Sequence, residues 1–162
     1  MSQSEATTQQ ALKAGKRTYK NCLMSGRYPY LQILDEILSD DMIAGRVDLG
    51  VIDVPAGQIV GAKSIGRRTA FAADFMPLLS PDSEFAGIRD PVRCYEYMGR
   101  FYVLEGNKRV SVLKSFGAAS VPGYVTRIIP RWSEDEAVAV YYEFMDFYRL
   151  SGQYEVYFSH RG

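Results

Sequence analysis

The sequence predicts an α+β fold: a small mixed sheet packed with helices, with extra helices at the N-terminus and one at the C-terminus. Three observations lead to this prediction. The chain has 162 residues and is 47% hydrophobic, which is enough for one domain with a real core. Short apolar runs bounded by glycine and proline, typical of strands, occupy its middle. Apolar residues at helical spacing precede and follow those runs.

The N-terminal part predicts two helices. Apolar residues recur at helical spacing over residues 8–25, with Gly26 as the end, and again over residues 31–38. The first helix also carries a basic face, formed by Lys13, Lys16, Arg17 and Lys20. Such a face either meets solvent or contacts nucleic acid or an acidic partner, and both interpretations stay open.

A strand and a basic loop follow. Residues 47–55 alternate apolar and polar side chains, which predicts a half-buried strand. The glycine-containing segment after it holds Arg67 and Arg68, and Thr69 can cap a helix over residues 70–79. This loop is a candidate for binding an anion. The alternative is a mobile charged loop.

Residues 92–104 predict a β-hairpin that runs directly into a helix. Two β-prone runs are joined at Met98-Gly99, which suits a tight connection. The second run passes through Gly106, where a tight turn is possible, into a helix over residues 107–117. The predicted apolar face of this helix comprises Val110, Leu113 and Phe116, and Gly117 closes it.

The start of this helix is suited to bind an anion. Asn107 is a good N-cap, the first N–H groups of a helix lack internal partners, and the macrodipole adds partial positive charge there. Lys108 and Arg109 add two cations that oppose the dipole, which suggests that an anion shares the space. The alternative is that both are solvated surface residues. Neither GxGxxG nor GxxxxGK[ST] is present.

The C-terminal third predicts a strand over residues 119–129 and a helix over residues 137–148. Ser133 and Glu136 form a capping box ahead of that helix, and residues 154–158 can form a last short strand. The aromatic side chains of the helix are expected to pack on the core. They are Tyr141, Tyr142, Phe144, Phe147 and Tyr148.

Composition limits the classes of function. The formal net charge is zero and the pI is about 6.6, which argues against a nucleic-acid-binding surface over the whole molecule but permits a local patch. Cys22 and Cys94 fit no CxxC pattern, so neither a disulfide framework nor a zinc site is indicated. The single histidine, His160, excludes a His-rich metal site. No leader or membrane-spanning run is evident, so we expect a cytoplasmic protein.

The order of the predicted elements carries a family resemblance. The series begins with a strand, a basic loop with its helix, and a hairpin. It continues with the segment Glu105-Gly-Asn-Lys-Arg109, a helix ending at Phe116-Gly117, and the segment Ser120-Val-Pro122. This ordered series resembles the ParB/sulfiredoxin superfamily over residues 48–129. The resemblance implies a ParB/sulfiredoxin-like core over residues 47–130, with an N-terminal helical extension over residues 1–46 and a C-terminal helix and tail over residues 131–162.

The resemblance also implies roles for individual residues. In ParB-type partition proteins the matching Gly-x-Arg-Arg segment binds nucleotide phosphates, so Gly106 is implied as the turn glycine and Lys108 and Arg109 as phosphate-facing cations. Lys108 stands where the family has arginine and lacks its bidentate fork. In sulfiredoxins a cysteine follows the glycine, whereas Asn107 cannot form a thiolate. Sulfiredoxin activity is therefore not expected unless Cys94 substitutes for that cysteine.

The favoured hypothesis is a regulatory module that binds a nucleotide or another phosphorylated ligand at residues 105–109. The resemblance implies a nucleoside triphosphate, ATP or CTP, with Mg²⁺. The ligand-binding residues would be Gly106, Asn107, Lys108, Arg109, Arg67, Arg68 and Thr69.

Two alternatives remain. The first is a Mg²⁺-dependent NTPase or small-molecule phosphotransferase in which Glu105 binds the metal or acts as a base, although Glu105 could equally only pair with Arg100 or Arg109. The second is a DNA-associated, partition-like accessory protein. Zero net charge makes DNA the less favoured partner. No membrane partner is expected.

Overall fold

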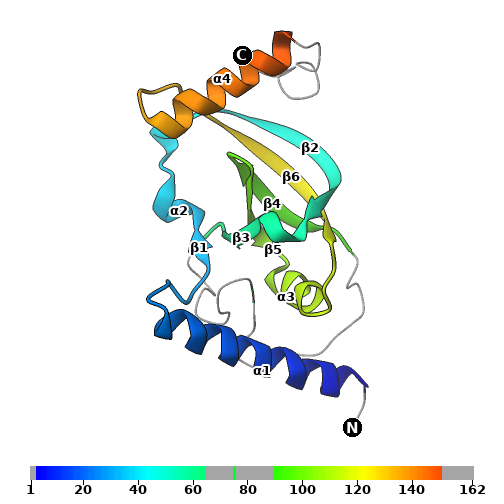
Figure 1. The fold of residues 1–162 in the computed structure, drawn as a ribbon. Helices are drawn as coiled ribbons and strands as arrows, with labels where there is room; N and C mark the ends of the chain where they lie inside the picture. Colours follow the sequence, from blue (N-terminus) through cyan, green and yellow to red (C-terminus); the bar gives the residue numbers. More distant parts are fainter. Residues whose placement is uncertain (1–2, 65–74, 76–89, 151–162) are drawn as a thin grey trace.

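The computed structural model describes residues 3–64, 75 and 90–150 of the chain (Figure 1). In this part of the chain, six strands form one mixed sheet in the order β1-β3-β5-β4-β6-β2. The strands are β1 (Gln32–Ile33), β2 (Ile43–Pro55), β3 (Ile59–Ala62), β4 (Val92–Tyr97), β5 (Arg100–Glu105) and β6 (Ser120–Pro130). The predicted hairpin is confirmed as the antiparallel β4–β5 pair, and β4 runs parallel to β6.

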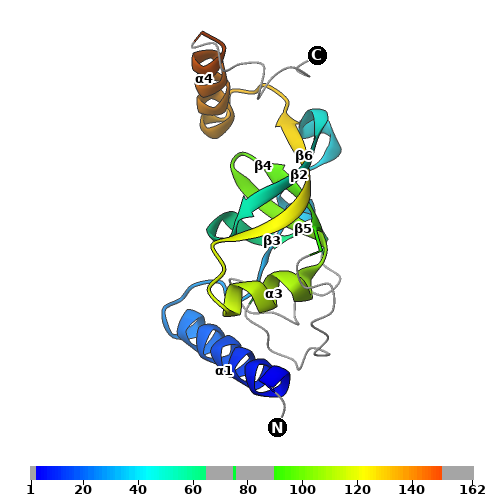
Figure 2. The same ribbon diagram turned by 90° about the vertical axis from the view of Figure 1, so that its right-hand side faces the viewer.

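Four α-helices accompany the sheet within the described residues: α1 (Gln3–Met24), α2 (Leu34–Ile37), α3 (Asn107–Ser115) and α4 (Glu136–Leu150). The predicted α+β class is therefore confirmed. Figures 1 and 2 show α1 and α3 together at one end of the sheet and α4 at the other end, beyond the long β2–β6 pair. None of the described helices combines the length and the hydrophobicity that crossing a membrane requires.

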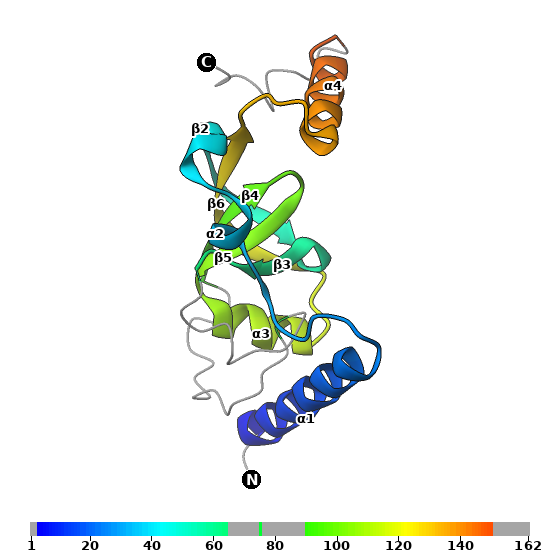
Figure 3. The same cartoon turned by 90° about the vertical axis from the view of Figure 1, so that its left-hand side faces the viewer.

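Two hydrophobic clusters lie on opposite faces of the sheet, as the alternation of side chains along its strands dictates. The larger cluster includes Val92 and Val103, and α3 packs Val110 and Leu113 against it. The smaller cluster places α2 against Tyr97 and Tyr102 of the hairpin and Ile128 of β6. Figure 3 shows α2 crossing this second face. The sheet is therefore covered on both faces, and α3 packs on the face of the larger cluster.

The predicted helix over residues 31–38 is wrong in its first half. Gln32 and Ile33 instead pair in parallel with Gly61 and Ala62, and the helix is the short α2. A Cβ atom on Gly61 would lie 2.1 Å from the carbonyl oxygen of Gln32, so the absence of a side chain is what lets the two strands approach. This contact between distant segments overrides the local helical spacing.

Both later helices differ from prediction at their ends. Phe116 is 56% exposed rather than part of the apolar face, because α3 ends at Ser115 and Gly117 then turns the chain with φ of 76°. The predicted capping box of α4 is wrong: Asp135 Oδ1 accepts hydrogen bonds from the N–H groups of Ala137 and Val138, at 3.1 and 3.3 Å.

The prediction that the aromatic side chains of α4 pack on the core is wrong for Tyr141, Tyr142 and Phe144, whereas the side chains of Phe147 and Tyr148 lie outside the described part. None of the described α4 side chains belongs to either hydrophobic cluster, and Phe144 is exposed. Tyr142 instead donates its hydroxyl hydrogen to the carbonyl oxygen of Pro130 at the end of β6. The predicted helix over residues 70–79 and strand over residues 154–158 lie outside the described residues, Phe75 excepted.

Candidate functional site

The β5–α3 junction turns on Gly106. This residue has φ of 109° and ψ of 24°, a left-handed conformation that favours glycine, and it occupies the N-cap position of α3. A Cβ atom there would lie 2.5 Å from Cγ1 of Val92. The predicted turn glycine is confirmed on both grounds. The predicted N-cap is wrong, because Asn107 is the first residue of the helix itself.

The first turn of α3 has no side-chain cap. Glycine at the N-cap has no side-chain oxygen that could accept from the first N–H groups, and the first turn contains no acidic residue. The carbonyl of Gly106 accepts the first hydrogen bond of the helix, from Val110 N at 3.0 Å. The amide groups that open α3 therefore keep the partial positive charge of the helix dipole.

Two polar atoms lie buried at the start of α3 with no hydrogen-bond partner among the described residues: Asn107 Oδ1 and Ser111 Oγ. Ser111 is only 2% exposed. Residues four apart share one face of a helix, and helical side chains lean towards its N-terminus, so Ser111 leans towards the turn that holds Asn107. Buried polar atoms in folded proteins nearly always have partners, which makes this pair unusual.

Arg109 holds the chain where it enters β4. Its Nη1 donates to the carbonyl oxygens of Asp90 and Pro91, at 3.0 and 3.2 Å. These bonds fix the backbone beside Gly106, so Arg109 has a structural task in addition to any contact with an anion. Lys108 is exposed. The two predicted cations thus lie in the same turn with different surroundings.

Glu105 forms an exposed ion pair. Its Oε2 lies 3.8 Å from Arg93 Nε across the β4–β5 pair, so its partner is neither Arg100 nor Arg109. Exposed pairs of this kind contribute little to stability. In the described part of the chain, no three residues of the types His, Cys, Asp and Glu gather to hold a metal ion. Among the described residues, no contact of Glu105 supports the alternative in which it acts as a catalytic base or metal ligand.

Cys94, the residue that would have to act as a nucleophile in place of Asn107, is buried. Its side chain is buried in the larger cluster, and burial, with a smaller effect from the charge of Glu96, raises its pKa to about 12. A thiol with this pKa does not ionise near neutral pH, and the thiolate is the reactive form. The burial and raised pKa of Cys94 therefore give no support to sulfiredoxin-like chemistry at this residue.

Sequence reasoning missed Ser111. Ser111 lies between two valines. Its spacing of four residues from Asn107 was the available signal, because residues four apart share one face of a helix. The other predicted ligand-binding residues, Arg67, Arg68 and Thr69, lie outside the described residues. No family model matches the chain, and neither does any curated protein or solved structure.

Proposed function

We propose that this chain is a ParB/sulfiredoxin-like module that binds a nucleotide or another phosphorylated ligand at the β5–α3 junction, in a regulatory role. One observation carries the proposal. The uncapped start of α3 lies beside two buried polar atoms, Asn107 Oδ1 and Ser111 Oγ, for which the described part of the chain supplies no hydrogen-bond partner. A ligand that supplies those partners removes an energetic cost already present in the free protein.

The chemistry of the junction suits a ligand with both phosphate and neutral polar groups. Amide groups at a helix N-terminus donate to phosphate oxygens, and Lys108 adds positive charge in the same turn. Ser111 can donate its hydroxyl hydrogen, whereas the Asn107 side-chain oxygen accepts one. A nucleotide offers phosphate oxygens, ribose hydroxyls and base amino groups together. Mg²⁺ bound mainly through phosphates needs only one or two carboxylates, and Glu105 is the carboxylate at this junction.

Ligand-dependent thermal stability tests the proposal. ATP, CTP, GTP and inorganic phosphate, with and without Mg²⁺, are added to the wild-type chain, Asn107→Ala and Lys108→Gln. At a ligand concentration a hundredfold above Kd, the free energy of unfolding rises by about 2.7 kcal/mol, equivalent to a melting temperature higher by roughly 5–10 °C. The two variants should lose most of this shift.

A matched control separates the site from general charge effects. Lys20→Gln removes the same charge from the exposed face of α1 and should retain the full shift. If no phosphorylated compound stabilises the wild-type chain, the proposed function is wrong. If Asn107→Ala and Lys108→Gln respond as the wild type does, a ligand binds elsewhere and the assigned site is wrong.

A second candidate, a DNA-associated accessory protein, is favoured by the charge distribution of α1. Its four exposed cations follow the spacing i, i+3, i+4, i+7 and form one stripe, the α1 basic stripe: Lys13, Lys16, Arg17 and Lys20. Residues 1–30 contain five basic residues but only one acidic residue, Glu5, although the whole chain is neutral. The phosphate backbone of DNA complements such a stripe.

Salt dependence tests this second candidate. Four phosphate contacts predict that affinity for duplex DNA falls on the order of a hundredfold between 50 and 200 mM salt. Replacing the α1 basic stripe with glutamine should abolish binding, whereas Lys108→Gln should not. Absence of binding at 50 mM salt, or binding that is insensitive to the stripe, would remove this candidate.

A further inference from the structure

A cavity of about 390 Å³ lies at the end of the β4–β5 hairpin farthest from α3. It is enclosed by the hairpin turn, by the 3₁₀ turn Asp40–Met42 and by the segment that links β6 to α4. Its volume is within the range of small-molecule sites in proteins. The β5–α3 junction contributes no residue to it, so it is a separate site.

The walls of the cavity are aromatic and thioether side chains. Tyr97 and Met98 come from the hairpin, Met42 from the 3₁₀ turn and Trp132 from the β6–α4 segment. Trp132 is 61% exposed, and Met42 is exposed as well. A ligand in the cavity would therefore cover large apolar groups that now face water, which is favourable.

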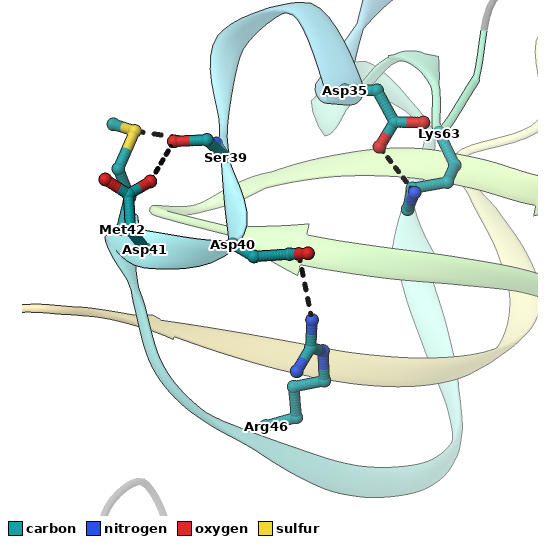
Figure 4. A network of polar contacts seen from close by, with 7 residues as sticks. All are labelled: Asp35, Ser39, Asp40, Asp41, Met42, Arg46 and Lys63. Atoms are coloured by element: carbon teal, nitrogen blue, oxygen red, sulfur yellow. Dashed lines mark hydrogen bonds and ion pairs between the residues drawn. The ribbon is translucent and has the colours of Figure 1, made fainter.

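Charges of mainly one sign line the same cavity. Asp41 and Asp135 are two carboxylates, against the single guanidinium of Arg131. Asp41 accepts a hydrogen bond from the hydroxyl of Ser39, which fixes its position in the 3₁₀ turn (Figure 4). Asp135 is fixed as the cap of α4.

Neither carboxylate is neutralised within the described part of the chain. Lysine and arginine side chains form ion pairs there with Asp40 and Asp35 nearby, as Figure 4 shows, but not with Asp41 or Asp135. Asp135 also lies close enough to Tyr97 to help burial raise the pKa of that phenol. The cavity thus combines aromatic walls with two carboxylates that form no ion pair with a lysine or arginine among the described residues.

We propose that this cavity binds a small organic cation: an amine or guanidinium group carried on an apolar or aromatic body. The faces of tryptophan and tyrosine attract cations, and thioethers pack well on aromatic and aliphatic bodies. Asp41 and Asp135 complement the charge, whereas an anionic ligand of the same shape meets two carboxylates. This inference does not depend on the proposed function of the β5–α3 junction.

Trp132 makes the test direct, because it is the only tryptophan in the chain. The full chain is titrated with phenethylammonium, and with two analogues of similar shape: neutral 2-phenylethanol and anionic 3-phenylpropionate. We expect a saturable change in tryptophan fluorescence with the cation, confirmed by calorimetry. The neutral analogue should bind about three- to tenfold more weakly, as expected for the loss of one partly exposed charge interaction, and the anion more weakly still.

Charge-neutralising variants locate the site. Asp135→Asn keeps a good helix cap while it removes the charge, and Asp41→Asn likewise keeps an acceptor for Ser39. Each should raise the Kd for phenethylammonium about three- to tenfold. Asp48→Asn is the control: Asp48 Oδ1 accepts from Gly50 N at 2.9 Å on β2 and does not line the cavity. Arg131→Gln should tighten binding, because it removes the like charge.

Four results would overturn the proposal. One is the absence of a saturable signal with phenethylammonium. Another is an equal response to the three analogues. The third is a Kd that Asp41→Asn and Asp135→Asn change no more than Asp48→Asn does. An arginine-containing peptide that binds where phenethylammonium fails would also overturn it, because the cavity would then serve a protein partner. Circular dichroism identifies a variant that has lost α4, and Asp41→Asn remains decisive in that case.

Discussion

Arg127 on β6 and Glu96 on β4 form a buried ion pair, with Arg127 Nε donating to Glu96 Oε2 at 2.7 Å. Their side chains are only 16% and 7% exposed. The other carboxylate oxygen, Glu96 Oε1, accepts from Gly99 N at 2.8 Å. Because Gly99 lies in the hairpin turn, with φ of 84°, this single carboxylate connects the turn to the strand beside it. The same turn forms a wall of the cavity.

Removing one partner of this pair should lower the free energy of unfolding more than removing one partner of an exposed pair does. Glu96→Ala removes the carboxylate that faces the partly buried guanidinium of Arg127 and also the acceptor of Gly99 N, so the free energy of unfolding should fall by about 3–5 kcal/mol. Urea denaturation measures the change. Arg46→Ala is the control, because Arg46 and Asp40 form an exposed pair at 3.8 Å and its loss should have little effect. Similar losses from the two variants would contradict this interpretation.

Gly106→Ala should be far more damaging than Gly26→Ala. Both positions have positive φ, 109° and 72°, so both variants carry the left-handed cost of about 1–2 kcal/mol. Only at Gly106 does the new Cβ also collide with Val92; nothing lies within 4 Å at Gly26. We expect Gly106→Ala to lose about 1–3 kcal/mol more, from overpacking, in thermal or urea denaturation. Equal losses would mean that the junction relaxes freely.

Ser111→Ala should stabilise the ligand-free protein. It removes a buried hydroxyl that has no hydrogen-bond partner among residues 3–64 and 90–150, and such groups cost about 1–3 kcal/mol. Ser115→Ala is matched to it, with the same gain in helix propensity, but Ser115 Oγ donates to the carbonyl of Val112 at 2.8 Å. Ser111→Ala should therefore be the more stable variant in urea denaturation and should bind a phosphorylated ligand less tightly. Lower stability than Ser115→Ala would show that Ser111 has an internal partner.

Stability should fall in alkaline solution because of Cys94. The thiol of the unfolded chain ionises near its ordinary pKa of 9.0, whereas burial raises the folded pKa to about 12, so the folded state holds the proton longer. The contribution of the Cys94 thiol to the free energy of unfolding is intact below pH 9. It declines by about 1.4 kcal/mol per pH unit as the pH rises towards 12. Burial also raises the pKa values of Tyr97 and Tyr102, which adds to the loss above pH 10.

Urea denaturation between pH 7 and 10.5 measures this decline, with Cys94→Ala as the comparison. The variant lacks the thiol and should show a shallower decline above pH 9. Thiol-specific reagents at pH 8 should also modify Cys94 no faster than the protein unfolds, because the thiol is buried and protonated. Identical pH profiles for the two proteins, or rapid modification of native Cys94, would contradict the assigned pKa.

The sequence by itself determined the features that depend on neighbouring residues. The hairpin, the passage of β5 through Gly106 into α3, and the turn at Gly117 that follows the helix all follow from local turn chemistry and periodicity. These signals lie within a few residues of the structure that they specify. They were sufficient to predict the α+β class and to identify the β5–α3 junction as a candidate site.

Only the tertiary structure decided which polar groups are buried and what they meet. Glu96 and Arg127, which are 31 residues apart in the sequence, form an ion pair because β4 and β6 lie side by side, and Ser111 is buried because α3 packs against distant parts of the sheet. The cavity walled by Trp132 likewise gathers segments from three parts of the chain. Burial and partnership depend on contacts between residues far apart in sequence, and no local pattern records those contacts.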